Sequence, residues 1–301
     1  MRHLSPGLVT LVLLHGMAAA GQTVESTHKG LSSGPLRHAR LASLSDGTVV
    51  RAGALRVTNA QLAAEISKAA AKLQPQLRRN AFLLAEQRVT RLLLAAEATD
   101  WAARTKRVAA AADDAARTGA YLQDIAGKAV VSDAEAREFY ESNRDTVGGA
   151  AYDAVASDLK QYLLQQKRQA VLDEHINGLS NRKPIEVDAA WCKVQAETAL
   201  DNPVDRARRS GKPALVDFGS KGCRPCDMLA PILDELRKAY AGKCAVLFVQ
   251  VTENQMLAAR YGVSSIPVQI FFDKDGSEVS RHVGFIPKDL IIKQLAGIGV
   301  K

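Results

Sequence analysis

Hydrophobic and polar positions follow two different periods in the last third of the chain. Residues 214–218 are apolar apart from Asp217, a pattern typical of a buried strand. After Cys226 the apolar residues recur at the spacing of one helix face and predict a core-facing helix: Leu229, Ile232, Leu233, Leu236 and Tyr240. Pro231 is expected to bend this helix and Gly242 to end it.

Further elements follow this helix, separated by glycine, proline or turn residues. They are a strand over 245–251, a short helix over 254–261, strands over 268–272 and 278–283, and a last helix through 290–295. The short crossovers favour parallel pairing of the first strands and an antiparallel hairpin at the end. The last third therefore predicts an α/β domain.

The middle of the chain, residues 46–189, is rich in alanine and leucine and repeats with a helical period. Capping boxes begin helices at Thr58 and Ser132, because a Gln or Glu stands three residues later. Apolar stripes predict longer helices over 82–96 and 152–163. No charged or cysteine cluster here indicates catalysis, so the prediction is an all-α structural or interaction domain.

The length of 301 residues leaves room for two domains and a linker. We place the helical domain at 46–189, a connector at 190–202 and the α/β domain at 203–301. Residues 21–45 contain Gly, Ser, Thr and His without periodicity, which predicts a flexible linker. The net charge of +8 comes from cations interleaved with acidic residues, so we expect no nucleic-acid binding.

Cys223 and Cys226 are two residues apart and stand directly after the predicted strand, where the predicted helix begins. The free N–H groups and the dipole at a helix N-terminus stabilise a thiolate, the reactive form of a redox cysteine. Arg224 adds positive charge and Pro225 stiffens the turn. The pattern predicts a dithiol/disulfide centre. Zinc is the alternative, but a structural zinc needs four ligands and no second pair accompanies this one.

Thiol–disulfide exchange needs one thiolate that attacks and a second thiol that resolves the mixed disulfide. A buried Asp217 could accept or deliver the proton of the second step, because burial raises the pKa of a carboxyl group. The alternative is that Asp217 is only a buried carboxylate with satisfied hydrogen bonds. His282 is interpreted as a strand residue rather than a base.

The N-terminus has the three-part order of a secretory signal peptide. Residues 1–3 are basic, residues 8–17 are mostly apolar, and residues 18–20 are alanines, so we expect cleavage after Ala20. No segment reaches about 18 apolar residues, and an integral membrane protein is not expected. Export of a redox protein predicts the periplasm or an equivalent space. The alternative is a cytosolic protein with an apolar N-terminus.

Residues 203–301 resemble a thioredoxin-fold domain in the order and spacing of five motifs: Val216-Asp217-Phe218, Cys223-Arg224-Pro225-Cys226, Met228-Leu229-Ala230-Pro231, Tyr261-Gly262-Val263 and Ile266-Pro267. The resemblance implies that Cys223 is the exposed nucleophile and Cys226 the resolving thiol, joined as a redox-active disulfide. It implies that Asp217 is the carboxylate buried beneath them. It implies no cofactor.

The resemblance also implies a substrate-binding surface around the cysteines. Pro267 would be the cis-proline, and the backbone of Ile266 would pair with an extended substrate strand. Arg224 and Pro225 would contribute to the same surface. Gly284 would be the glycine of the final strand.

Two positions depart from the thioredoxin pattern. Gly222 stands where thioredoxins usually carry a tryptophan, and Phe248 stands where a lysine usually accompanies the buried aspartate. The segments 211–219 and 281–285 are more similar to exported bacterial thioredoxin-family proteins and to the C-terminal domain of the DsbD electron-transfer protein. Ordinary cytosolic thioredoxin activity is therefore not assumed.

The helical domain is similar to SurA-like chaperone domains. Residues 49–53 and 57–62 are similar to the start of such domains, and residues 131–143 to the segment that precedes their parvulin domain. The parvulin domain itself has no room here, so no prolyl isomerase activity is expected. The resemblance implies binding of unfolded or extended polypeptide. A helical spacer or oligomerisation arm is the alternative.

Two further cysteines remain: Cys192 lies just before the α/β domain, and Cys244 lies at the start of its second strand. They would approach each other if an N-terminal strand paired beside that second strand, and in an oxidising compartment they could form a structural disulfide. The alternative is two buried thiols that act as small apolar residues.

Three functions compete at this point. The first, preferred, is a periplasmic thiol–disulfide oxidoreductase whose helical domain binds or positions disulfide-containing or unfolded clients. The second is a chaperone with little redox activity. The third is a dedicated electron carrier reduced by a DsbD- or CcdA-type membrane protein. Ile266 before the proline favours reductase behaviour by resemblance, whereas Arg224 favours the opposite direction by stabilising the thiolate.

Overall fold

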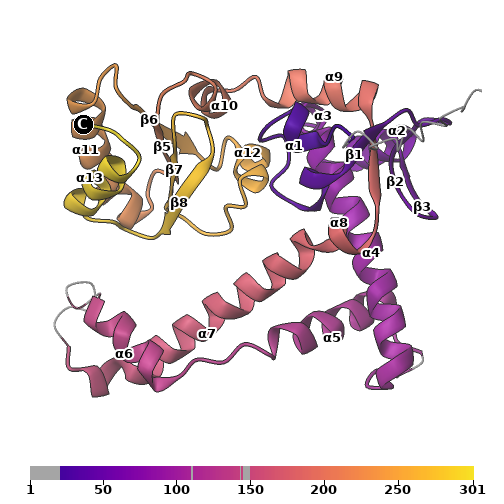
Figure 1. Ribbon diagram of the computed structural model, residues 1–301, viewed down its shortest axis with the longest axis horizontal. Helices are drawn as coiled ribbons and strands as arrows, with labels where there is room; N and C mark the ends of the chain where they lie inside the picture. Colours follow the sequence, from indigo (N-terminus) through magenta and orange to yellow (C-terminus); the bar gives the residue numbers. More distant parts are fainter. Residues whose placement is uncertain (1–20, 110, 143, 145–149) are drawn as a thin grey trace, which may run out of the picture.

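The computed structural model describes residues 21–109, 111–142, 144 and 150–301 (Figure 1). The predicted signal peptide, residues 1–20, lies outside the described residues. Two sheets organise the described chain, one with the strand order β1-β4-β2-β3 and the other with the order β6-β5-β7-β8. Each sheet has its own hydrophobic core, so the chain contains two packing units.

The C-terminal unit has the predicted order of elements. They are β5 (Ala214–Gly219), α11 (Arg224–Ala239), β6 (Ala245–Gln250), α12 (Gln255–Arg260), β7 (Val268–Phe272), β8 (Glu278–Val283) and α13 (Lys288–Gly297). β5 pairs with β6 in parallel, whereas β7 is antiparallel to both β5 and β8. The predicted α/β domain, with its parallel pair and final hairpin, is confirmed.

Alternation along the strands sends side chains to two opposite layers of this domain. Leu215 of β5 packs in a cluster with residues of α11 and α13, such as Leu233 and Leu295. Val216 packs on the other face with α10 (Pro203–Arg208) and α12, through Val204 and Ala258. The domain is therefore a helix–sheet–helix sandwich, and α11 covers the face to which Asp217 also belongs.

The N-terminal unit is helical, as predicted, but it also contains a four-stranded sheet. The strands are β1 (Arg40–Ala42), β2 (Thr48–Ala52), β3 (Leu55–Thr58) and β4 (Ile185–Asp188). β1 and β4 come from opposite ends of the unit and pair in parallel. The prediction of an all-α domain is wrong in this respect, because the strands are short and β4 pairs with β1 and β2 from more than a hundred residues away.

Helices surround that sheet and extend from it. In chain order they are α1 (Val24–Thr27), the 3-10 helix η1 (Pro35–His38), α2 (Asn59–Lys68), α3 (Gln74–Arg79), α4 (Ala81–Thr105), α5 (Asp114–Ala126), α6 (Asp133–Ser142), α7 (Tyr152–Asn177), α8 (Leu179–Arg182) and α9 (Ala189–Ala199). The capping box predicted at Thr58 is present at the start of α2.

Residues 21–45 are not the flexible linker that was predicted. Val24, Leu31 and Leu36 are buried in the N-terminal core, although they follow no regular period. The buried carboxylate of Glu86 in α4 accepts hydrogen bonds from Ser32 Oγ and from the backbone N–H of Leu36. Burial raises the pKa of Glu86 to about 7. The segment is therefore an ordered part of the core.

Residues 190–202 are likewise not a free connector. Most of them form α9, which begins at the Asp188 cap and buries Cys192 and Ala196 in the N-terminal core. The ring of Trp191 stacks on Phe82 of α4, with the ring centroids 5.8 Å apart. The boundary between the two units therefore falls after α9, where Asn202 caps α10.

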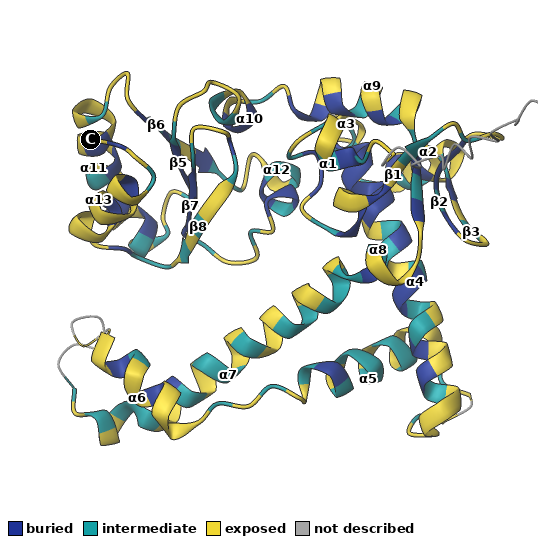
Figure 2. Ribbon diagram, viewed as in Figure 1, coloured by how far each residue is buried: buried dark blue, intermediate teal, exposed yellow. Residues whose placement is uncertain are grey.

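The helical arm, which consists of α5, α6 and α7, extends away from the N-terminal sheet (Figure 1). α7 packs against α5 and α6 along one side, and Leu159 is its one buried residue (Figure 2). At the base of the arm, Glu97 of α4 accepts hydrogen bonds from Tyr121 and Arg182 and lies 3.0 Å from His175 Nε2. This polar cluster connects α4, α5, α7 and α8 where the arm begins.

The two units are joined by hydrogen bonds from the segment around residue 30. Lys29 Nζ donates to the carbonyl of Asp275 at 2.6 Å. Arg260 of α12 donates from Nη1 to the carbonyl of Gly30 at 2.7 Å, and Ser33 Oγ donates to the Arg260 carbonyl. The N-terminal segment therefore holds the α/β domain against the helical unit. Across the described ranges, no helix is both long enough and apolar enough to cross a membrane.

Candidate active site

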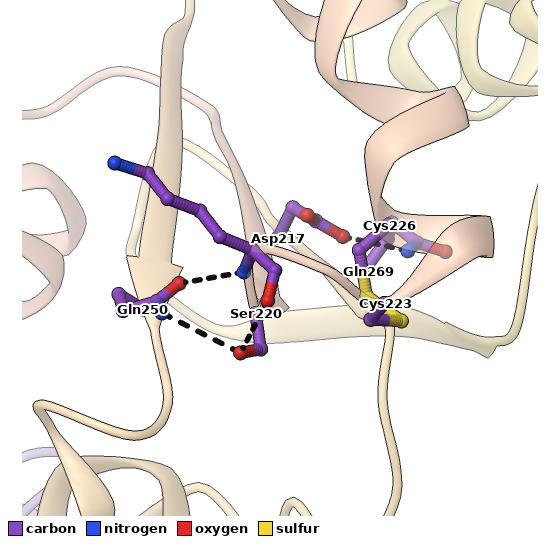
Figure 3. The surroundings of a disulfide bond; sticks show 7 residues. Asp217, Ser220, Cys223, Cys226, Gln250 and Gln269 are labelled. Carbon is purple, nitrogen blue, oxygen red and sulfur yellow. Dashed lines mark hydrogen bonds between the residues drawn. A yellow bond between two sulfur atoms is a disulfide. The ribbon is translucent and has the colours of Figure 1, made fainter.

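The two cysteines predicted to be redox-active form a disulfide at the start of α11. Cys223 and Cys226 are bonded, with their Cα atoms 5.2 Å apart (Figure 3). Cys223 is the N-cap of the helix and half-buried, whereas Cys226 is only 3% exposed. A thiolate on Cys223 would therefore face the free N–H groups of the first helical turn and remain open to a partner.

The loop before the disulfide explains one departure from the thioredoxin pattern. Gly222 has φ of +81°, in the left-handed region that glycine adopts without steric cost. A Cβ atom there would meet no other atom within 4 Å, so the space beside Cys223 is open. Arg224 and Pro225 occupy the first two helical positions, with Arg224 exposed. A bulky side chain at position 222 is thus absent from the surface that a client meets.

Asp217 lies on β5 beneath the disulfide and is fully buried. Gln269 Nε2 of β7 donates a hydrogen bond of 2.7 Å to Asp217 Oδ1, whereas Asp217 Oδ2 has no partner among the described residues. Burial raises the pKa of Asp217 to about 6, and the hydrogen bond from Gln269 opposes that rise. The carboxyl group can therefore gain or lose a proton near neutral pH.

Phe248 of β6 stands directly opposite Asp217 in the parallel register. It is 39% exposed and forms one wall of a pocket of about 260 Å³ beside the disulfide. The lining residues are Ser220, Lys221, Cys226, Asp227, Ala230, Leu233, Asp234, Arg237 and Phe248. An aromatic ring thus occupies the side of Asp217 where the thioredoxin pattern has a lysine.

The Ile266–Pro267 peptide bond is cis, and Pro267 is buried immediately before β7. The carbonyl of Pro267 accepts a hydrogen bond of 2.8 Å from the N–H of Gly284, which has φ of +98°. Val268 pairs with Phe218, so the start of β7 and the end of β5 share one edge of the sheet. The cysteine loop and the proline therefore emerge at the same edge.

Gln269 was not identified from the sequence as a site residue. Its position became visible only when the strand register placed it opposite Asp217. The available signal was a lone amide in the otherwise apolar run Val268–Phe272, since a buried polar group needs a partner. His282 lies on β8 opposite Gln269, and its Nε2 is 3.1 Å from the carbonyl of Phe285.

The structural disulfide predicted between Cys192 and Cys244 is absent. Both thiols are free and buried, and they belong to different cores. Cys192 lies on α9 in the N-terminal core because β4 pairs with β1 and β2 rather than beside β6. Burial raises the pKa of Cys192 to about 12 and that of Cys244 to about 11, so both stay protonated near neutral pH.

A disulfide at a helix N-terminus, on an α/β sheet edge that also carries a cis-proline, defines a thioredoxin-like thiol–disulfide site. The family model Thioredoxin matches residues 186–297. A thioredoxin from Alicyclobacillus acidocaldarius is 39% identical over 101 residues, which cover 34% of this chain and 95% of that protein. A thioredoxin from Staphylococcus aureus is 48% identical over 81 residues, which cover 27% of this chain and 77% of that protein.

The chain therefore belongs to the thioredoxin family through its C-terminal domain. A solved mutant thioredoxin from Halobacterium salinarum NRC-1 is 32% identical, with a TM-score of 0.30, and the match covers 33% of this chain and 83% of that chain. Membership implies thiol–disulfide oxidoreductase function for this domain. The family match begins at residue 186, so the helical arm lies outside it.

Proposed function

We propose that the protein is an exported thiol–disulfide oxidoreductase that reduces client disulfides in the periplasm and binds or positions those clients with its N-terminal unit. The observation that carries the proposal is the asymmetric disulfide at the start of α11. Cys223 is half-buried at the helix N-terminus and Cys226 is almost fully buried. The Cys223 sulfur is thus accessible for attack on a client disulfide, and the buried Cys226 sulfur can then resolve the mixed disulfide.

The reaction transfers two electrons from the protein dithiol to a client disulfide. The Cys223 thiolate attacks one client sulfur, the client S–S bond breaks, and a mixed disulfide forms. Cys226 then loses its proton, with Asp217 as the proposed acceptor, and its thiolate attacks Cys223 Sγ. The Cys223–Cys226 bond forms as the client sulfur leaves as a thiolate. The protein is then oxidised, the state in which the structure holds the two sulfurs.

Two further features support the location and the role of the N-terminal unit. The basic, apolar and small-residue order of residues 1–20 supports export. Val130, between α5 and α6, is 74% exposed and Tyr162 of α7 is 45% exposed; both are proposed as apolar contacts for an extended polypeptide. The proposed SurA-like character of this unit rests on its sequence motifs at residues 49–62 and 131–143.

Trapping with Cys226→Ala tests this proposal against its alternatives. Without the resolving thiol, the mixed disulfide between Cys223 and a client persists and can be isolated under non-reducing conditions. We expect many different captured proteins, all released by a reductant. A Cys223→Ala/Cys226→Ala double variant is the matched control and should capture none. Capture of one or two proteins would instead identify a dedicated electron carrier, and capture equal to the control would contradict disulfide exchange.

A further inference from the structure

A row of four side chains crosses the sheet beneath the disulfide in strict strand register. Phe248 of β6 stands opposite Asp217 of β5, Asp217 opposite Gln269 of β7, and Gln269 opposite His282 of β8. Registered neighbours lie on the same face of a sheet. That face is the one covered by α11, which carries Cys226. Asp217 is therefore enclosed by two specific neighbours and by the helix above.

Gln269 distinguishes the two oxygens of the Asp217 carboxyl group. Its Nε2 donates to Oδ1 at 2.7 Å, and this bond is drawn in Figure 3. Oδ2 and Gln269 Oε1 are both buried and have no partner among the residues the structure describes. Because an amide N–H can only donate, Oδ1 remains an acceptor in either protonation state. Only Oδ2 is left to carry the exchangeable proton.

The free oxygen of Asp217 and the resolving cysteine both lie close to Gly219. A Cβ atom on Gly219 would stand 3.3 Å from Asp217 Oδ2 and 3.4 Å from Cys226 Cβ. The same point lies 2.9 Å from the Phe248 ring, so Gly219 leaves room for all three groups to converge. Phe248 lines the surface pocket, whereas Asp217 is fully buried and does not line it.

The charged groups near Asp217 line the surface pocket beside Phe248. Lys221 lies in the loop, and Asp227, Asp234 and Arg237 lie on α11, with Arg237 paired to Asp234. His282, next in the row, has its Nε2 on the Phe285 carbonyl. The pKa of Asp217 is displaced by burial and by the Gln269 hydrogen bond alone. The immediate contacts of the carboxyl group, rather than a nearby charge, therefore determine when it ionises.

We infer that Gln269 is a positioning residue that fixes the Asp217 carboxyl with Oδ2 towards Cys226, and that Phe248 closes this oxygen from solvent. The inference rests on the proposed oxidoreductase function. During resolution the Cys226 thiol gives its proton to Asp217 Oδ2, and the resulting thiolate attacks Cys223 Sγ as the client thiolate leaves. The proton then returns to water or to the departing thiolate when the site opens.

Carbon-13 NMR of the Asp217 carboxyl group in the oxidised full chain tests the inference without any client. The wild-type carboxyl should titrate near pH 6. Gln269→Met keeps the size of the side chain but removes the donor, so the midpoint should rise by about one pH unit. Phe248→Ala admits water and should lower the midpoint by about one pH unit. His282→Gln, the control within the row, should leave it unchanged.

A single-turnover rate connects these midpoints to resolution. Glutathione is first attached to Cys223, and its release by Cys226 is followed against pH. The midpoint of this profile should move with the NMR midpoint in each variant, and Gln269→Met should have no further effect in an Asp217→Asn background. An unmoved Asp217 midpoint in both Gln269→Met and Phe248→Ala would overturn the inference. A wild type that releases glutathione but reduces no protein disulfide would instead count against the proposed function alone.

Discussion

Cys223→Ser should reduce the rate of insulin-disulfide reduction to the background rate of the reductant alone. The serine hydroxyl keeps the size of the side chain, but it forms neither a thiolate nor a mixed disulfide at neutral pH. Cys226 cannot replace Cys223, because it is only 3% exposed behind the first turn of α11. Turbidity of insulin with dithiothreitol as electron source measures the loss directly.

The matched controls are the two free thiols outside the site. Cys192→Ala and Cys244→Ala remove buried cysteines whose raised pKa values keep them protonated, so insulin reduction should stay at the wild-type rate. If Cys223→Ser retained activity while Cys192→Ala or Cys244→Ala lost it, the reactive thiol would have been misassigned. Equal aggregation protection by wild type and Cys223→Ser would indicate that any chaperone function is separate from the disulfide.

Asp205→Ala should destabilise the α/β domain by about 3–5 kcal/mol, the typical cost of leaving one member of a buried ion pair without its partner. Asp205 and Arg260 are each 2% exposed and form a salt bridge. Asp205 also accepts hydrogen bonds from Tyr261 Oη at 2.7 Å and from Asn202. Without Asp205, the Arg260 guanidinium remains buried with the Gly30 carbonyl as its remaining acceptor.

Hydrogen exchange of the buried amides of β5 reports this loss within the α/β domain itself. Asp201→Ala is the control, since it removes an ion pair with Arg206 in which both side chains are more than half exposed. Such a pair contributes up to about 1 kcal/mol. An Asp205→Ala effect no larger than that of Asp201→Ala would contradict the assigned importance of the buried pair. Because Arg260 also contacts Gly30, weaker attachment of the N-terminal segment should accompany the loss.

The α/β domain could be predicted from the sequence because its elements are local and strongly patterned. The apolar stripe of α11 and the unbroken strand of β5 each occupy consecutive residues. The N-terminal sheet could not be predicted in this way. β1 has only three residues, so neither its length nor its pattern of apolar positions indicates a strand. Its partner β4 begins at Ile185, far along the chain. The buried residues of 21–39 are likewise isolated in sequence and gain their packing from distant helices.

Within the candidate site, too, local features could be predicted from the sequence, whereas features that depend on long-range strand pairing could not. Cys223 and Cys226 are recognised from spacing and from their place at a helix start, both of which are local features. Gln269 becomes relevant only through the register of β5 and β7, which depends on long-range pairing. The absent Cys192–Cys244 bond has the same cause, since it depended on where β4 would pair. Long-range strand pairing is what the sequence left undetermined.

The equilibrium reduction potential of the Cys223–Cys226 pair, measured on residues 21–301 in glutathione redox buffers, shows whether the protein acts as a reductase. A thioredoxin-like reductase should have a potential near the thioredoxin value of about −270 mV. A potential of about −120 to −180 mV, in the range from DsbA to disulfide isomerase, would contradict the reductase direction and indicate an oxidase or isomerase. Failure to cycle between dithiol and disulfide would contradict redox function altogether.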